Sequence, residues 1–243
     1  MNGVSLSARY GFPPNSLGYC GKGSFTEALR KHLEGGNDAA LEAELRKFKT
    51  QFTYLSLIAR ENGKKPFDFD VVEAFWIGNE LLDSISHGSL RSFILKDLFP
   101  PGNARASKLA RSLPEGAVPH HSFNSLYIRF LSDSVERSVQ NLDSCCITWG
   151  KVISVSKDKV SMMRNSISSD GKRFVIRPVE SVVVLEKNGI RFLDGVSKGD
   201  VLSVHWGMAI EKLSEERVAR LEKYTRINVA ACDPSTNFQN FSR

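Results

Sequence analysis

The chain has 243 residues, of which 41% are hydrophobic and 25% are charged, and a formal net charge of +6 at pH 7. These values are ordinary for a soluble globular protein with room for two modest domains. No apolar run approaches the ~20 residues that a membrane helix needs, and the first ten residues lack the apolar core of a secretory signal. We therefore expect a cytoplasmic protein with no membrane partner.

The basic excess lies in the second half of the chain. Up to Asp143 there are 17 basic and 16 acidic residues, whereas from Ser144 onward there are 16 basic and 11 acidic residues. The charges alternate in sign, which is typical of an ordinary solvated surface, so we expect no nucleic-acid partner. Four cysteines are present without a CxxC pair, which excludes a zinc ribbon and predicts free thiols in a reducing compartment.

Helical periodicity dominates the first half of the chain. Apolar residues recur at spacings of three and four, and glycines and prolines separate the periodic segments. Within the segment at 70–85, Gly78-Asn79 interrupts the pattern, which suggests close packing against another element. The last segment is predicted as a helix or as an extended piece followed by a helix. The predicted helical segments are 24–34, 39–59, 70–85, 90–98, 104–113 and 122–141.

From Ile147 the periodicity changes toward two. Short runs rich in β-branched residues alternate with turn pairs such as Asn188-Gly189 and Gly199-Asp200. Several short strands with close turns predict a small β-barrel, because closure removes exposed strand edges. A helix follows from Ser214. We predict an α+β fold with a helical domain at 1–143, a β-barrel domain with a C-terminal helix at 144–232, and a flexible tail at 233–243.

Two motifs in the first half concentrate chemically useful side chains. Residues 8–21 read Ala-Arg-Tyr-Gly-Phe-Pro-Pro-Asn-Ser-Leu-Gly-Tyr-Cys-Gly, and their prolines and glycines predict an irregular loop. Tyr10, Asn15, Tyr19 and Cys20 would line a pocket there, or the loop would only fill the interface between the halves. Residues 118–124 contain the second motif, with adjacent histidines.

The adjacent histidines, His120 and His121, would face opposite ways on an extended chain, so only one would serve a given site. Two histidines without spaced third and fourth ligands are weak metal evidence. The structural alternative is helix capping and packing after Pro119.

Two blocks in the second half carry a family resemblance. Residues 145–152 read Cys-Cys-Ile-Thr-Trp-Gly-Lys-Val, and residues 199–211 read Gly-Asp-Val-Leu-Ser-Val-His-Trp-Gly-Met-Ala-Ile-Glu. Over about 145–226 the chain thus resembles the HypC/HupF/HybG family, small OB-like β-barrel chaperones of [NiFe]-hydrogenase maturation. The whole chain also resembles an uncharacterised family encoded near hydrogenase genes.

The resemblance implies a metal-related role for two residues. In that family the cysteine, with the partner HypD, handles an iron that carries cyanide and carbon monoxide, and it contacts the hydrogenase large-subunit precursor. Cys145 and His205 match the family's cysteine and histidine, which implies that they are transient iron ligands. Trp149 stands where the family has proline and is included in the implied binding site. Cys145 is internal here, so no free α-amino group lies beside its thiol.

Plainer roles exist for the same residues. Cys145 would be a buried thiol at a domain junction, and His205 a strand-end histidine bonded to backbone. A thiolate at Cys145 would be favoured by cations, for which Lys151, Arg177 and Lys212 are candidates. Cys146 should pack in the core.

The sequence favours an accessory protein that binds the large-subunit precursor or a HypD-type scaffold. The alternative is a small-molecule enzyme whose pocket is built by the two N-terminal motifs. In that case Cys20 would act as nucleophile and a histidine as acid or base.

Overall fold

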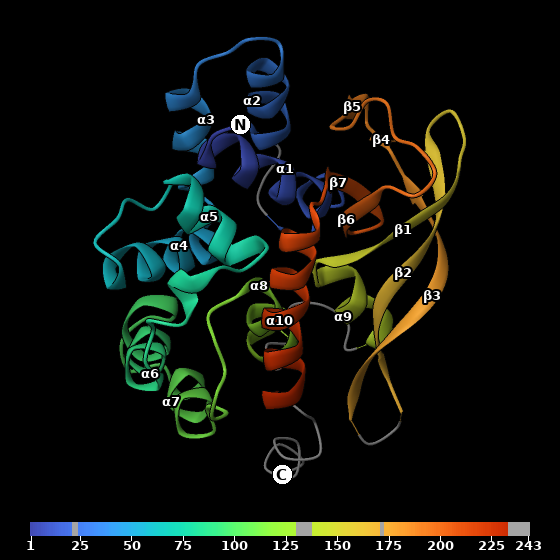
Figure 1. Ribbon diagram of the computed structural model, residues 1–243. Helices are drawn as coiled ribbons and strands as arrows, with labels where there is room; N and C mark the ends of the chain where they lie inside the picture. Colours follow the sequence, from blue (N-terminus) through green and yellow to red (C-terminus); the bar gives the residue numbers. More distant parts are fainter. Residues whose placement is uncertain (21–23, 130–137, 171–172, 233–243) are drawn as a thin grey trace.

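The computed structural model describes residues 1–20, 24–129, 138–170 and 173–232 (Figure 1). Within these described residues, helices occur as far as Cys145, strands lie between Thr148 and Lys212, and the long helix α10 (Glu215–Ala231) follows. The predicted mixture of helices and strands is confirmed, whereas the tail at 233–243 lies outside the described residues. The helices before the strands are α1 (Gly3–Ser16), α2 (Ser24–Leu33), α3 (Asp38–Leu45), α4 (Lys49–Glu61), α5 (Phe69–Trp76), η1 (Glu80–Leu82), α6 (His87–Phe93), η2 (Ile94–Leu98), α7 (Ala104–Arg111), α8 (His121–Phe123), η3 (Asn124–Arg129) and α9 (Val139–Cys145).

Helix α1 replaces most of the irregular loop that we expected at 8–21. Asn2 caps it by accepting a hydrogen bond from the Ser5 amide at 2.9 Å, and Pro13 and Pro14 lie in its last turn. The loop prediction was wrong because proline has a φ compatible with a helix, although each proline there removes a donor and crowds the carbonyl four residues earlier. The buried face of α1 supplies the packing that offsets those two lost bonds.

The segment at 39–59 forms two helices, α3 and α4, instead of one. The chain breaks around Phe48, whose ring packs edge-on against Phe25 with centroids 4.7 Å apart. The apolar spacing of the sequence continues across this break, so periodicity alone could not reveal it.

Gly78 ends the helical run that begins with α5, and it does so where another element approaches. Its φ is +95°, and a Cβ atom there would lie 2.2 Å from Cδ2 of Tyr224 on α10. The predicted close packing at this glycine is confirmed. The contact fixes the C-terminal helix against the helical half of the chain.

Five strands pair in the order β1-β2-β3-β7-β6, and β6 pairs back with β1. The link between β3 and β7 is a single parallel pair, Val184 with Met208. The predicted strands are short, whereas β2 and β3 have 11 residues each and pair along their length as one long hairpin. An OB-like barrel of the HypC type stays a prediction. The strands are β1 (Thr148–Val155), β2 (Lys159–Ser169), β3 (Phe174–Val184), β4 (Glu186–Lys187), β5 (Ile190–Arg191), β6 (Val201–His205) and β7 (Met208–Lys212).

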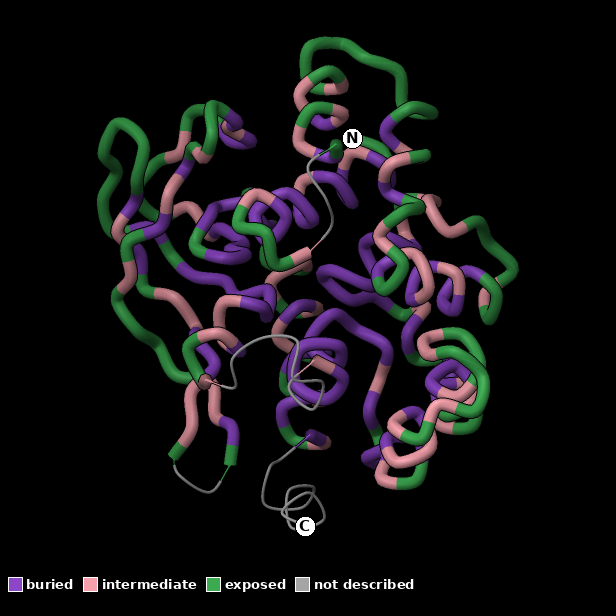
Figure 2. Tube along the Cα trace, turned by 180° about the vertical axis from the view of Figure 1, so that it is seen from behind, coloured by how far each residue is buried: buried purple, intermediate pink, exposed green. Residues whose placement is uncertain are grey.

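The helical and strand halves share one hydrophobic core. A single cluster of buried side chains includes residues of both halves, and buried segments gather where the halves meet (Figure 2). Arg217 on α10 adds ion pairs to Glu73 on α5 at 2.9 Å and to Glu211 on β7 at 2.8 Å. Helix α10 therefore ties the two halves together, and the division into domains at 143/144 stays a prediction.

Candidate functional site

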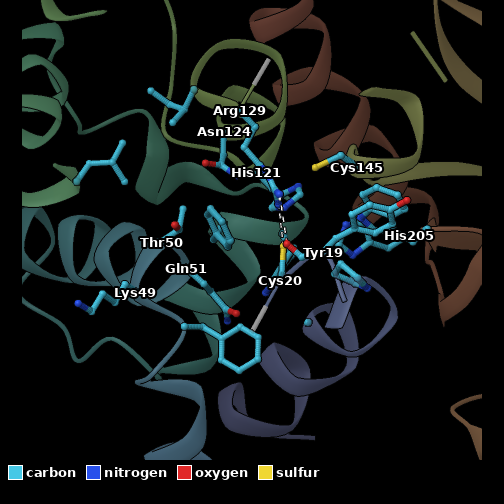
Figure 3. A pocket seen from close by; sticks show the side chains of 18 of the residues that line it. Tyr19, Cys20, Lys49, Thr50, Gln51, His121, Asn124, Arg129, Cys145 and His205 are labelled. Atoms are coloured by element: carbon cyan, nitrogen blue, oxygen red, sulfur yellow. Dashed lines mark hydrogen bonds between the residues drawn. The ribbon is translucent and has the colours of Figure 1, made fainter. Parts of the chain in front are cut away.

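A cavity of about 400 Å³ lies where the end of α1, α5, η3, α9 and the β6–β7 turn meet (Figure 3). This volume falls within the range of small-molecule sites. The two N-terminal motifs and both HypC-like blocks each contribute to its wall. Chemically relevant side chains in the wall are Tyr19, Cys20, Trp76, His121, Asn124, Arg129, Cys145, His205 and Trp206.

His205 ends strand β6 and is 1% exposed. Its Nδ1 lies 2.7 Å from the backbone oxygen of Tyr10. Because Pro14 has no N–H, it cannot occupy that oxygen in the helical i+4 pattern. A carbonyl only accepts, so Nδ1 carries the hydrogen and Nε2 of the neutral ring keeps a lone pair. Nε2 has no hydrogen-bond partner among the described residues.

The His205 ring is neutral at physiological pH. Burial lowers its pKa to about 4, although the backbone carbonyls of Tyr10 and Cys145 act in the opposite direction. The lone pair on Nε2 is therefore available to a ligand that accepts an electron pair, and the ring does not have to lose a proton first.

His121 begins α8 beside His205. The two ring centroids lie 5.1 Å apart, and the His121 ring also packs on Trp76 at 4.5 Å. Burial lowers the pKa of His121 well below its usual value, and the charges of His205, His120 and Arg129 lower it further. Nδ1 of His121 is a second ring nitrogen without a partner in the described part of the chain. The pocket thus holds two neutral imidazoles.

His120 faces away from the cavity. Its Nδ1 accepts from the Ser122 amide at the start of α8, and its Nε2 donates to the Trp76 carbonyl at 3.2 Å. Burial lowers its pKa to about 3, against the effect of that carbonyl. His120 is therefore the capping residue, and His121 is the histidine of the pair that lines the pocket.

Cys145 is the last residue of α9 and is 7% exposed. Ser125 donates a hydrogen bond to its sulfur at 3.3 Å. Burial raises the pKa of the Cys145 thiol, although the positive charge of Arg129 and the bond from Ser125 lower it. Cys145 is thus a protonated thiol in this structure, while Cys146 packs in the hydrophobic core as predicted.

Arg129 is the positive charge that acts on the Cys145 thiol, and it is not among the three cations that we expected there. Lys151, Arg177 and Lys212 do not contribute to the electrostatics of Cys145. A clue existed, because His121, Asn124, Ile128 and Arg129 recur at helical spacing and all line the cavity. The segment was predicted as a helix or as an extended piece followed by a helix, and the second alternative does not contain this spacing.

Cys20 lies on the wall formed by the end of the N-terminal motif. Arg129 donates from one terminal nitrogen to the Cys20 sulfur at 2.7 Å, drawn as a dashed line in Figure 3. The Asn15 amide donates to the Cys20 carbonyl at 2.7 Å and fixes the backbone. Asn15 therefore positions Cys20 and does not line the cavity itself.

An aromatic pair covers part of the cavity. The Tyr19 ring stacks on the Trp206 ring with centroids 4.3 Å apart. Trp206 has a φ of +49° in the two-residue turn between β6 and β7, a conformation that is costly for a bulky residue. Such strain persists where the surroundings demand it, and here it holds the indole against Tyr19 at the pocket.

Two predicted site residues lie outside the cavity. Tyr10 is fully buried, and its hydroxyl hydrogen-bonds with Ser203 at 2.8 Å while its ring stacks on Trp76. Trp149 is 2% exposed in the hydrophobic core. The structure therefore brings five predicted residues together in the lining of one cavity, namely Tyr19, Cys20, His121, Cys145 and His205. It leaves Tyr10, Asn15, His120 and Trp149 as supporting residues outside that lining.

Five buried polar atoms in the wall have no hydrogen-bond partner among the described residues. Leaving such a group unpaired costs about 1–3 kcal/mol. Their concentration in one cavity is typical of a site that receives a polar ligand. Within the same described ranges, no group of three or more His, Cys, Asp or Glu side chains is arranged to hold a metal ion. The five atoms are Trp76 Nε1, His121 Nδ1, Asn124 Oδ1, His205 Nε2 and Trp206 Nε1.

Comparison with known proteins gives one match. A family model described as a family of unknown function (DUF6390) matches residues 1–238. The chain belongs to this family. No curated protein and no solved structure matches the chain with significant similarity. In the described part of this DUF6390 protein, no helix has the length and apolar character required to cross a membrane.

Proposed function

We propose that this DUF6390 protein is an accessory protein of [NiFe]-hydrogenase maturation that holds an iron–cyanide–carbon monoxide group in the central pocket. The observation that carries the proposal is the meeting of Cys145 and His205 at one cavity. These are the two residues that the HypC resemblance selects, and they come from segments 60 residues apart. The unpartnered Nε2 of His205 supports a ligand at this point.

The number of donors favours such a cargo over a bare metal ion. A resident transition metal usually takes about four protein donors, and the described residues offer no group of three. An iron that arrives with its own cyanide and carbon monoxide ligands needs fewer donors from the protein. Cys145 and His205 would supply them, with Cys145 losing its proton to solvent as its sulfur binds iron.

The remaining parts of the proposal concern partners and location. The HypC-like barrel would bind the hydrogenase large-subunit precursor or a HypD-type scaffold, in the cytoplasm and without nucleic acid or membrane. Since Cys145 is buried, cargo would pass between the walls of the cavity and the Tyr19–Trp206 pair. An internal cysteine would then act without the free amino group that HypC carries.

The test is to produce the tagged protein anaerobically together with a hydrogenase maturation system. We expect it to retain the large-subunit precursor or the scaffold and to show infrared C≡N and C≡O stretching bands. Cys145→Ala should fold normally but lose the bands and the maturation activity. Cys146→Ala is the matched control and should keep both, at a cost of about 1 kcal/mol of stability. A wild-type protein without bands and without either partner, or full activity of Cys145→Ala, would contradict the proposal.

A small-molecule enzyme is the second candidate, because Cys20 and His121 line the same cavity. A nucleophilic thiol with a nearby neutral imidazole fits acyl or alkyl transfer to Cys20. Incubation with small electrophilic metabolites followed by intact-mass analysis distinguishes the candidates. A covalent adduct that is lost in both Cys20→Ser and His121→Gln but kept in Cys145→Ala favours the enzyme.

A further inference from the structure

The cavity contains two thiols, and the resemblance accounts for only one. Cys20 is half-buried, whereas the other three cysteines are buried. Cys20 and Cys145 lie on different walls of the same cavity, one at the end of the N-terminal motif and one at the end of α9 (Figure 3). Their sequence separation of more than 100 residues means that the fold itself brings them to this site.

Arg129 connects the two thiols electrostatically. It donates a hydrogen bond to the Cys20 sulfur at 2.7 Å, and its charge also acts on Cys145. Hydrogen bonds from a guanidinium are stronger when the acceptor is ionised. Arg129 therefore places one positive charge in the lining that holds both sulfurs, against the sulfur of Cys20.

Each thiol is also held in place by a neutral side chain. Asn15 donates to the Cys20 carbonyl at 2.7 Å, and the single hydroxyl hydrogen of Ser125 faces both the Cys145 sulfur at 3.3 Å and the Cys145 carbonyl at 3.2 Å. These bonds fix the two sulfur-bearing residues before any ligand enters. A prearranged pair of donors loses less entropy on binding than two independent ones.

We infer that Cys20 also binds the cargo, so that the cavity holds one thiophilic centre between the sulfurs of Cys20 and Cys145. This sulfur pair takes the place of the Cys145–His205 pair, because the described residues offer no group of three donors. This inference rests on the proposed function, because it names how the cargo is held. The ligand class is a soft metal centre that carries small ligands of its own. Two thiolates add negative charge to such a complex, and Arg129 supplies the compensating positive charge in a wall where both imidazoles are neutral.

Phenylarsine oxide tests the two-thiol site on the purified, reduced protein without any hydrogenase component. Arsenic forms two As–S bonds, the arsenical oxygen leaves as water with the two thiol protons, and no atom changes oxidation state. We expect one arsenical per wild-type chain, with the loss of two titratable thiols. Cys20→Ser and Cys145→Ser should each weaken binding by at least about 100-fold, as expected when one of two linked contacts is removed.

The controls are Cys146→Ala and Cys232→Ala, which leave the proposed pair intact and should bind as wild type does. Thermal unfolding of every variant establishes that it is folded. Wild-type affinity in Cys20→Ser, or wild-type binding no tighter than that of the single-thiol variants, would overturn the inference. Infrared bands of the co-produced protein report separately on the proposed function. Two-thiol arsenical binding without infrared bands would contradict the proposed function and leave the two-thiol site standing. Infrared bands without two-thiol arsenical binding would contradict the role of Cys20 and leave the proposed function standing.

Discussion

Acidification should destabilise this protein well above the pH at which its carboxylates titrate. His120, His121 and His205 are all buried and neutral, with the pKa of His120 lowered to about 3 and that of His205 to about 4. In the unfolded chain the same histidines titrate near pH 6.5. Below that pH the unfolded state binds protons that the folded state does not bind, so the free energy of unfolding falls as pH falls.

The size of the effect follows from the proton count. Each such histidine contributes a slope of about 1.4 kcal/mol per pH unit once the unfolded form is protonated. Because the unfolded form is only half protonated at about pH 6.5, each histidine removes about 1.6 kcal/mol between about pH 6.5 and 5, and the three together remove about 5 kcal/mol. That is comparable to the whole unfolding free energy of a typical domain, about 5–15 kcal/mol. Glu211, whose pKa is raised by burial against the charge of Arg217, acts in the opposite direction and reduces the total.

Urea unfolding followed by circular dichroism at about pH 7.5, 6.0 and 5.0 measures this slope. The stability should be fully present above about pH 6.5 and should fall steadily below it. Replacing His205 with Gln removes one of three equivalent contributions and should reduce the slope by about a third. A stability that is flat between pH 6.5 and 5, or that rises on acidification, would refute the assignment of three neutral buried imidazoles.

Two further predictions concern packing and partners. Gly78→Ala should lower the unfolding free energy by roughly 3 kcal/mol, because it adds a clash with the Tyr224 ring to backbone strain. Gly102→Ala is the control for strain alone, since φ is also positive there but open space surrounds the new Cβ; equal losses of stability in thermal melts would argue against the clash. The strand half carries basic charge without paired aromatic residues, so any single-stranded DNA or RNA complex should dissolve at physiological salt. A sub-micromolar, salt-resistant complex in a mobility-shift titration would exclude this prediction.

Local patterns predicted most of the elements but few of the contacts. The helical spacing around Phe75 and Trp76 and the interruption at Gly78 correspond to α5 and its close contact with α10. The change of period at Ile147 corresponds to the start of the strands. Helix α1 was missed because two prolines suggest a loop, although burial of the helix offsets the two bonds that they remove.

The composition of the pocket depended on contacts that no local pattern contains. The bond between His205 and the Tyr10 carbonyl spans 195 residues. Arg129 meets Cys20 across 109 residues. The family resemblance selected Cys145 and His205, and the N-terminal motifs selected Cys20 and His121, but only tertiary packing brings the two sets into one cavity. Trp76 is both buried in the core and part of the cavity lining.

A purely structural role explains only one of the two ring nitrogens of His205. His205 does bond to backbone at the end of a strand, as a structural histidine would, and Pro14 leaves the Tyr10 oxygen free for that bond. This role uses Nδ1 alone and leaves Nε2 buried without a partner in the described structure. A residue needed only for this hydrogen bond would make the fold more stable if it carried one hydrogen-bond donor and no second polar atom, since each unpaired buried atom costs about 1–3 kcal/mol. The same reasoning applies to His121, whose Nδ1 also lies unpaired. His205 Nε2 and His121 Nδ1 thus lie unpaired in the lining of one cavity, together with two thiols and Arg129. A ligand that binds these atoms explains this arrangement, whereas the stability of the fold does not.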